Sequence, residues 1–243
     1  MKYQGSKNKI ADKLLSVILK DYKQGQTYIE PFVGGCNMID KVYHITDRLG
    51  NDKNFYLIEM WKALQKGWKP PIFFSEEEYK DIRANYKSYN PELVGYVGFC
   101  SFGANFFSGY PKHHSRNSYD IEVYCREYYN NIMKQLPFID NVKFTCLDYF
   151  DLNIPDNSLV YCDPPYAGTT GYNRFGLDLN IDHNAFWQWV RDISKKNIVY
   201  VSEYTAPDDF ECVLDLNLVS GYRGRYTNTN NQVKQEKLFR LRT

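Results

Sequence analysis

The stretch TYIEPFVGGC, residues 27–36, decides the fold class of this chain. Its first residues are typical of a short strand, and Gly34 and Gly35 then break the strand with a tight turn. Beyond the turn, Met38, Ile39 and Val42 recur at helical spacing with Tyr43 beside them, which predicts a helix from about Asn37. A strand, a glycine turn and a helix form the opening of an α/β nucleotide-binding unit.

The rest of the chain repeats the alternation of strands and helices. Strands are expected at 143–147, 158–162, 197–202, 210–219 and 236–242, and helices at 55–66 and 186–194. Ser6 is expected to cap a further helix that carries Ile10, Leu14, Val17 and Ile18 on one face. The apolar run at 197–202 is typical of a parallel sheet that is covered on both faces. We therefore expect an α/β, Rossmann-like fold, with a mostly parallel twisted sheet and helices on both faces.

Residues 68–142 interrupt this alternation. The segment opens on two prolines and is rich in Tyr, Asn, Lys and Gly, with GFCSFGANFFSGYPKHHSRNSY at its centre. A long irregular insertion in a compact domain is usually functional or disordered, and the many aromatic residues argue against disorder. We predict a catalytic domain of residues 1–67 and 143–243 with an inserted recognition lobe, and expect most aromatics of 96–110 in the lobe's core.

Composition sets further bounds. The formal net charge of +1 gives no bulk attraction to polyanions, so a nucleic-acid site would depend on local clusters. The six cysteines are scattered without a C-x-x-C pair, which argues against a zinc site and predicts reduced thiols in a cytoplasmic protein. No run is long and apolar enough to suggest a membrane span, and we expect no metal.

The stretch YCDPPYAG, residues 161–168, ends a buried strand on an acid, two prolines and an aromatic ring. An exocyclic amino group has two N–H donors, which Asp163 and the Pro164 carbonyl could accept together. Consecutive prolines fix φ and remove two backbone donors, so the corner is stiff and rich in acceptors. Tyr166 adds a flat surface for the base that carries the amino group. Such a site would act through position and preorganised dipoles.

With these motifs in place, the sequence resembles the Dam-type DNA adenine N6-methyltransferases, which use S-adenosylmethionine. The resemblance covers nearly the whole chain. It is carried by KYQGSK at 2–7, EPFVGGC at 30–36, NDKNFYLI from Asn51, CLDYF at 146–150 and DPPY at 163–166. DPPY alone is moderately specific, whereas the ordered set is strong.

The resemblance implies roles for individual residues. Asp163 and Pro164 would grip the target amino group and Tyr166 would stack on a base flipped out of the duplex. Asp52 would accept from the cofactor ribose. The remaining cofactor contacts would come from Tyr3, Lys7, Glu30, Pro31, Phe32, Gly34, Gly35, Cys36, Asp148, Tyr149 and Asp163. The DNA contacts would come from Lys7, Lys112, His113, Arg116, Asn117, Arg223 and Arg225.

One position departs from the family pattern. Cys36 stands where the family usually has glycine, and a Cβ there would crowd a close backbone approach or penalise a positive φ. A measured cofactor affinity would decide whether the change weakens binding.

Plainer interpretations stay open. Asp163 could cap a proline turn, Asp52 and Lys7 could be solvated, and Tyr3 could be a core aromatic. The basic residues could form solvated faces. The alternatives to a duplex DNA enzyme are a methyltransferase that acts on RNA adenine or on a protein amide, and a degenerate homologue that only binds DNA or a partner. The recognition sequence, for which GATC is only a family-based guess, is not given by the residues. The host, a restriction endonuclease partner and the oligomeric state, with a monomer favoured, are also left open.

Overall fold

The computed structural model describes residues 1–111, 121–166, 175, 180–218 and 234–242. These residues form two compact units, each built from two segments of the chain. Unit 1 comprises Met1–Ala11 and Phe32–Leu152, and unit 2 comprises Asp12–Pro31 and Asn153–Thr243. The boundaries of the predicted catalytic domain and of the predicted lobe at 68–142 differ from those of the two units. That division therefore stays a prediction.

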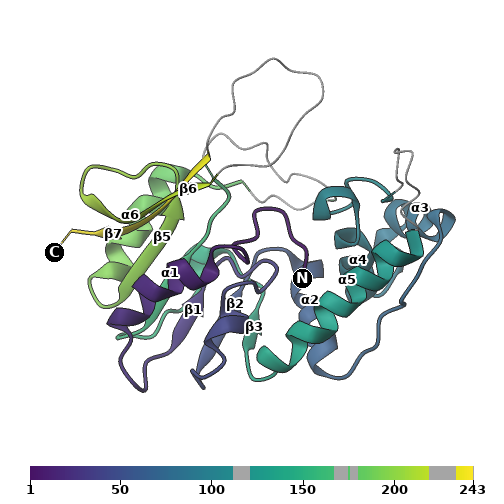
Figure 1. Cartoon of the computed structure of the whole chain (residues 1–243), viewed down its shortest axis with the longest axis horizontal. Coiled ribbons are helices and arrows are strands. Elements are labelled where there is room, and N and C mark those ends of the chain that lie inside the picture. Colours follow the sequence, from purple (N-terminus) through teal and green to yellow (C-terminus); the bar gives the residue numbers. More distant parts are fainter. Residues whose placement is uncertain (112–120, 167–174, 176–179, 219–233, 243) are drawn as a thin grey trace, which may run out of the picture. The chain divides into compact units, whose positions relative to one another are not determined.

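Unit 2 contains five strands in the order β1-β4-β5-β7-β6 (Figure 1). They are β1 (Tyr28–Glu30), β4 (Leu159–Cys162), β5 (Ile198–Glu203), β6 (Phe210–Leu218) and β7 (Lys234–Leu241). The first three in this order run parallel, and β7 runs antiparallel to both β5 and β6. Every residue of β1 and β4 is buried, as expected for strands covered on both faces. The strands predicted in this half of the chain are confirmed.

The helices of unit 2 are held to the strands by specific side chains. Helix α6 (His183–Ser194) starts at Asp182, whose carboxylate accepts the backbone N–H groups of Asn184 and Ala185. Its Trp187 ring packs 4.6 Å from the ring of Phe210 on β6. Helix α1 (Ala11–Ile18) is followed by a 3₁₀ turn whose Asp21 accepts a 2.6 Å hydrogen bond from the Tyr200 hydroxyl of β5.

The predicted cap of α1 is wrong. The Ser6 hydroxyl accepts the N–H of Asn8 instead, and a hydrogen-bonded turn from Lys7 to Ile10 separates it from the helix. Ser6 therefore closes a local turn, which is a common alternative for a serine beside a helix.

Unit 1 has two parallel strands, β2 (Arg48–Asn51) and β3 (Lys143–Thr145), with Gly50 opposite Phe144. Its helices are α2 (Phe55–Gln65), α3 (Glu76–Ala84), α4 (Pro91–Phe99) and α5 (Ile121–Gln135) (Figure 1). Short 3₁₀ segments occupy Ile39–Val42, Tyr86–Ser88, Phe102–Ala104, Leu136–Phe138 and Tyr149–Asp151. Helices α2 and α4 approach so closely that a Cβ at Gly95 would lie 2.2 Å from the Tyr56 carbonyl oxygen.

The predicted helix from about Asn37 is also wrong, because only the 3₁₀ turn Ile39–Val42 forms there. The buried Arg48 side chain accounts for the difference. Its guanidinium donates a 2.8 Å hydrogen bond to the Ile39 carbonyl, the group that an α-helix would offer to the N–H of Tyr43. Tyr43, predicted to lie on the apolar stripe, is 58% exposed.

The aromatics predicted for the lobe core are buried at Tyr96, Phe99, Phe106 and Phe107, whereas Phe102 is exposed. The predicted fold class is confirmed, because parallel pairs predominate among the seven strands and helices pack on them. In the described part of the chain, no helix has the length and apolar character needed to cross a membrane.

Candidate active site

The glycine turn of unit 1 spans Phe32–Cys36 and is hydrogen-bonded at both ends. The N–H of Val33 donates to the Asn51 carbonyl at the end of β2, and the N–H of Cys36 returns to the Val33 carbonyl at 2.9 Å. Gly34 has φ +47° and Cys36 has φ +57°. The concern raised by Cys36 therefore has a structural basis, since a residue with a Cβ is held in the left-handed region.

Tyr3 lies against this turn. A Cβ added at Gly34 would come within 2.8 Å of the Tyr3 ring, and one added at Gly35 within 2.7 Å of the Tyr3 Cβ. The Phe99 ring also lies beside the Tyr3 ring, at 5.4 Å between centroids. Both glycines are thus required by the close approach of Tyr3, which is half-buried.

The carbonyl groups of the turn are fixed by two residues that the sequence did not single out. The Trp61 indole N–H of α2 donates to the Gly34 carbonyl at 3.1 Å. The Gln135 amide of α5 donates to the carbonyls of Gly35 and Cys36 at 3.0 and 2.8 Å. Gln135 continues the buried stripe of Cys125, Tyr128 and Ile132, and a polar residue on such a stripe is the signal that could have identified it.

Asp52 faces the same turn. Its carboxylate accepts the N–H of Gly34 at 3.0 Å and the N–H of Asn54 at 2.9 Å. Burial raises the pKa of Asp52 from 3.8 to about 6, although these two N–H groups oppose the shift. The preceding Asn51 is fully buried and joins β2 to the chain after β3, accepting the N–H of Leu147 and donating to its carbonyl, both at 3.0 Å. Asp52 is half-buried, and its carboxylate is hydrogen-bonded to the turn and to the start of α2.

Asp148 and Tyr149 lie on the same side of unit 1 as Asp52. The Phe32 ring of the turn packs 5.4 Å from the Tyr149 ring. Asp148 caps the 3₁₀ segment through the N–H of Phe150 and accepts a 2.8 Å hydrogen bond from Lys53. Burial raises the pKa of Asp148, but Lys53 and the backbone N–H groups of Phe150 and Tyr149 together outweigh burial, so the net pKa is lowered.

These residues fit the nucleoside end of S-adenosylmethionine. Asp52 offers carboxylate oxygens for ribose hydroxyls, and the half-buried Phe32, packed against the Tyr149 ring, offers aromatic surface for a purine. Lys53 was not expected from the sequence, and it already engages the side chain of Asp148. An adenine amino group would have to share that carboxylate with Lys53.

The strand end of unit 2 carries the DPPY motif. Strands β1 and β4 are parallel neighbours, with Ile29 opposite Val160, so Glu30 and Asp163 leave the sheet at the same edge. The Glu30 carboxylate accepts the Tyr28 hydroxyl at 3.0 Å and is 3% exposed. Burial raises the pKa of the Cys162 thiol well above its usual value, and the charges of Asp163 and Glu30 add to the shift. Pro31 and Pro164 follow the two acids directly.

Tyr166 is held by residues from outside its motif. Its hydroxyl donates to the Glu236 carboxylate of β7, and its ring meets the Tyr204 ring edge-on at 4.6 Å. Glu203, at the end of β5, is 2% exposed and accepts the N–H of Tyr204 at 2.6 Å. Glu236 was not expected from the sequence, because a strand predicted at 236–242 does not reveal which edge its first residue reaches.

Of the predicted DNA-binding residues, only Lys7 lies within the described part of the chain. It is 7% exposed and its ammonium group donates to the Gly5 carbonyl at 3.3 Å, so the solvated interpretation is wrong. The other six fall outside the described residues: Lys112, His113, Arg116, Asn117, Arg223 and Arg225.

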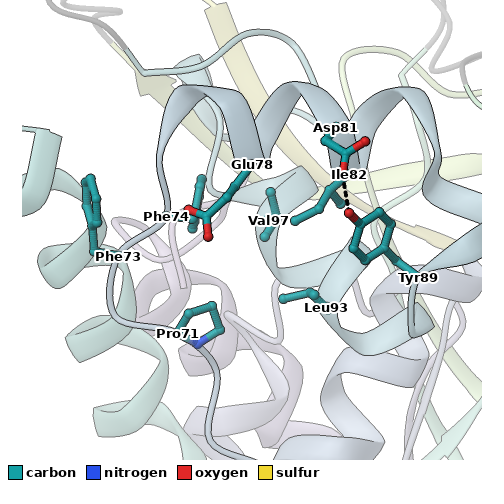
Figure 2. Close-up of a pocket in the computed structure, with 9 residues that line it drawn as sticks. All are labelled: Pro71, Phe73, Phe74, Glu78, Asp81, Ile82, Tyr89, Leu93 and Val97. Atoms are coloured by element: carbon teal, nitrogen blue, oxygen red, sulfur yellow. Dashed lines mark hydrogen bonds between the residues drawn. The ribbon is translucent and has the colours of Figure 1, made fainter.

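Figure 2 shows a separate pocket of about 210 Å³ in unit 1, formed by α3, α4 and the chain before them. Its walls are mostly apolar, with Phe73, Phe74, Leu93 and Val97 beside a Tyr89 hydroxyl that donates to Asp81. None of the predicted site residues lines it.

Comparison with known proteins decides the family. The model of the D12 class N6 adenine-specific DNA methyltransferase family matches residues 3–203. The chain belongs to this D12 class. The match runs from Tyr3 of the first motif to Glu203 at the end of β5, so it includes the glycine turn, Asp52, Asp148 and DPPY. The resemblance inferred from the sequence is confirmed at the level of the family.

Two curated relatives of this D12-class chain are named methyltransferases. The Type II methyltransferase M.FokI of Planomicrobium okeanokoites is 26% identical over 199 residues, which cover 71% of this chain and 30% of that protein. The Retron Ec67 DNA adenine methylase of Escherichia coli is 22% identical over 266 aligned positions, covering 98% of this chain and 84% of that protein. The chain thus spans less than a third of M.FokI and most of the retron methylase.

Among solved structures, SMU.472 complexed with SAH matches 96% of the D12-class chain and 51% of its own. The identity is 10% and the TM-score is 0.39, and a likeness this weak carries no argument.

Proposed function

We propose that this chain transfers a methyl group from S-adenosylmethionine to the N6 amino group of adenine in duplex DNA. The observation that carries the proposal is the shared edge of β1 and β4, which brings Glu30-Pro31 and Asp163-Pro164 together at parallel strand ends. The glycine turn follows Pro31 directly in the chain. Membership of the D12 class and the names of both relatives support the proposal.

In this proposal the chain's own groups orient the target. Asp163 and the Pro164 carbonyl accept the two N–H groups of the adenine, which favours a pyramidal nitrogen with a freer lone pair. Tyr166 stacks on the base after it leaves the duplex, at a cost of a few kcal/mol for unstacking. When bound, S-adenosylmethionine supplies an electrophilic methyl group on a sulfonium sulfur. In the transfer the target nitrogen would gain the methyl group and lose one proton to solvent, and S-adenosylhomocysteine would be the leaving product.

The cofactor would be held by the residues around the glycine turn. Asp52 would accept from the ribose, Asp148 and Tyr149 would lie at the adenine, and Glu30 to Cys36 with Tyr3 and Lys7 would surround the methionine part. For the DNA, Lys112, His113, Arg116 and Asn117 would contact bases, whereas Arg223 and Arg225 would contact phosphates. We place the protein in the cytoplasm of a bacterial or phage-infected cell. A restriction partner is proposed by analogy with M.FokI.

The proposal is tested by methyl incorporation from labelled S-adenosylmethionine into duplex DNA, with RNA as the competing substrate. We expect labelling of DNA adenine by the wild type and a loss of at least about hundredfold for Asp163→Ala, because the target amino group loses an acceptor. Cofactor affinity, measured by calorimetry, should fall far less than labelling in Asp163→Ala, because Asp163 is only one of the proposed cofactor contacts. Equal labelling by this variant would overturn the catalytic assignment.

Two other outcomes separate the alternatives. Preferential labelling of RNA would favour an RNA adenine methyltransferase. A wild type that shows neither labelling nor a cofactor-dependent rise in melting temperature would favour a binding protein without catalysis, since a ligand that binds only the native state stabilises it.

A further inference from the structure

Glu236 reaches the catalytic edge of unit 2 because β7 runs against its neighbours. In the β5–β7 pair, Ser202 lies opposite Leu238 and Glu203 opposite Lys237. The N-terminal residues of β7 therefore lie where β4 and β5 end. Alternation along the strand puts Glu236 on the same face as Leu238, and both side chains are buried.

The contacts of Glu236 and Tyr204 restrain the Tyr166 ring at two points. The hydroxyl at one end of the side chain donates to the Glu236 carboxylate. Tyr204, which follows β5, meets the ring edge-on with an interplanar angle of 87°. A tyrosine side chain has two rotatable bonds, so fixing its far end and one edge leaves a single orientation.

The electrostatics of the cluster keep the Tyr166 hydroxyl a donor. Burial raises the pKa of Tyr166 well above its usual value, and the charges of Asp163 and Glu236 raise it further. The neighbouring Tyr161 responds in the same way, because burial and the charges of Asp163, Glu236 and Glu30 all raise its pKa. A buried carboxylate is costly unless it is hydrogen-bonded, and the Tyr166 hydroxyl supplies such a bond to Glu236.

We propose that Glu236 is a positioning residue, which acts through the Tyr166 hydroxyl to fix the ring in the orientation that an extruded adenine meets. The inference rests on the proposed function and deepens it. Glu236 does not touch the substrate, so its removal should impair the geometry of the bound base and leave the cofactor site of unit 1 intact.

The experiment compares five variants with the wild type: Glu236→Ala, Glu236→Gln, Tyr166→Phe, the double variant Glu236→Ala/Tyr166→Phe, and Glu211→Gln. Glu211, on the neighbouring β6, is a matched control because its carboxylate pairs with Arg240 and is exposed. The readouts are kcat and KM on duplex DNA, calorimetric affinity for S-adenosylmethionine, and the fluorescence of 2-aminopurine at the target position.

We expect Glu236→Ala to lower kcat between about tenfold and a hundredfold, since a displacement of about 1 Å can cost about a hundredfold. Cofactor affinity should stay within about twofold of the wild type, because the variant leaves Asp52 and the glycine turn unchanged. The amide oxygen of Glu236→Gln can still accept the hydroxyl, so this variant should retain most of the activity. The 2-aminopurine signal should change in Glu236→Ala and not in Glu211→Gln.

The double variant tests the route of the effect. If Glu236 acts only through the hydroxyl, adding Glu236→Ala to Tyr166→Phe causes no further loss. Additive losses, or a Glu236→Gln variant as inactive as Glu236→Ala, would overturn the positioning role. If the wild type methylates DNA, a kcat of Glu236→Ala equal to that of the wild type would also overturn the positioning role. A wild type that methylates no adenine would instead overturn the proposed function, and the positioning role with it.

Discussion

At the scale of single residues, Asp52 lies in an environment that raises the pKa of its carboxyl group. Its carboxylate is buried against the glycine turn, and its pKa is raised to about 6. An unfolded Asp titrates near its usual value of 3.8, so the native state binds the extra proton between about pH 4 and 6. The contribution of Asp52 to folding stability therefore falls as the pH rises through this window.

The affinity for the cofactor should show the opposite dependence on pH. In the proposed function ribose hydroxyls would donate to the charged carboxylate, so affinity should fall as the pH drops through about 6, where the free chain takes up a proton. Calorimetry with S-adenosylhomocysteine between pH 7.5 and 5 measures this, with about tenfold weaker binding expected for each unit well below the pKa. Asp52→Asn should bind weakly at all pH values and lack the inflection. An unchanged inflection in Asp52→Asn would assign the titration to another group.

Cys36 provides a second test at this scale. Its φ of +57° is disfavoured for any residue with a Cβ and most disfavoured for a β-branched one. Cys36→Val should therefore lower the free energy of unfolding by about 2 kcal/mol relative to Cys36→Ala. Cys36→Gly should stay within about 1 kcal/mol of the wild type, since relief of strain offsets lost burial and a more flexible unfolded chain. Denaturant unfolding measures all three, and a Val variant as stable as the Ala variant would contradict the strain.

At the scale of elements, the local sequence pattern was sufficient to predict a helix or strand where its packing depends on a single apolar face. Helix α2, strands β4 and β5, and the DPPY corner needed only periodicity and proline stiffness. The pattern failed at residues 38–43, where only a 3₁₀ turn forms and the distant Arg48 guanidinium donates to the Ile39 carbonyl. It also missed Trp61, Gln135 and Glu236, whose partners lie far away in the sequence. Such contacts depend on tertiary packing, which a local pattern does not encode.

Gln135 shows how one element stabilises another. Its amide satisfies two buried carbonyl groups of the glycine turn, so Gln135→Ala should lower the free energy of unfolding by about 2 kcal/mol and weaken cofactor binding. Lys134→Ala, on the exposed face of the same helix, is the matched control. Thermal unfolding and calorimetry give the two quantities, and equal behaviour of the two variants would contradict the role of Gln135.

At the scale of the whole molecule, the net charge of +1 leaves DNA affinity to local clusters. Replacing both Arg223 and Arg225 by alanine should reduce the slope of log affinity against log salt by about 2, because the two proposed phosphate contacts would be lost. The control removes the same charge at Lys195 and Lys196, which pair with Asp192 and Asp156. Titration of labelled duplex DNA at several salt concentrations measures the slopes. Identical slopes for both double variants would show that Arg223 and Arg225 do not make the phosphate contacts.

The long reach of Gln135 has a consequence for the order of events during synthesis. The turn at Gly35 takes its shape from a side chain that is added to the chain a hundred residues later. A nascent polypeptide that ends before Gln135 contains KYQGSK, EPFVGGC and Asp52. It lacks the Gln135 amide that donates to the carbonyls of the turn. Ribosome-bound fragments should therefore gain affinity for the methyl donor only once α5 has emerged from the exit tunnel.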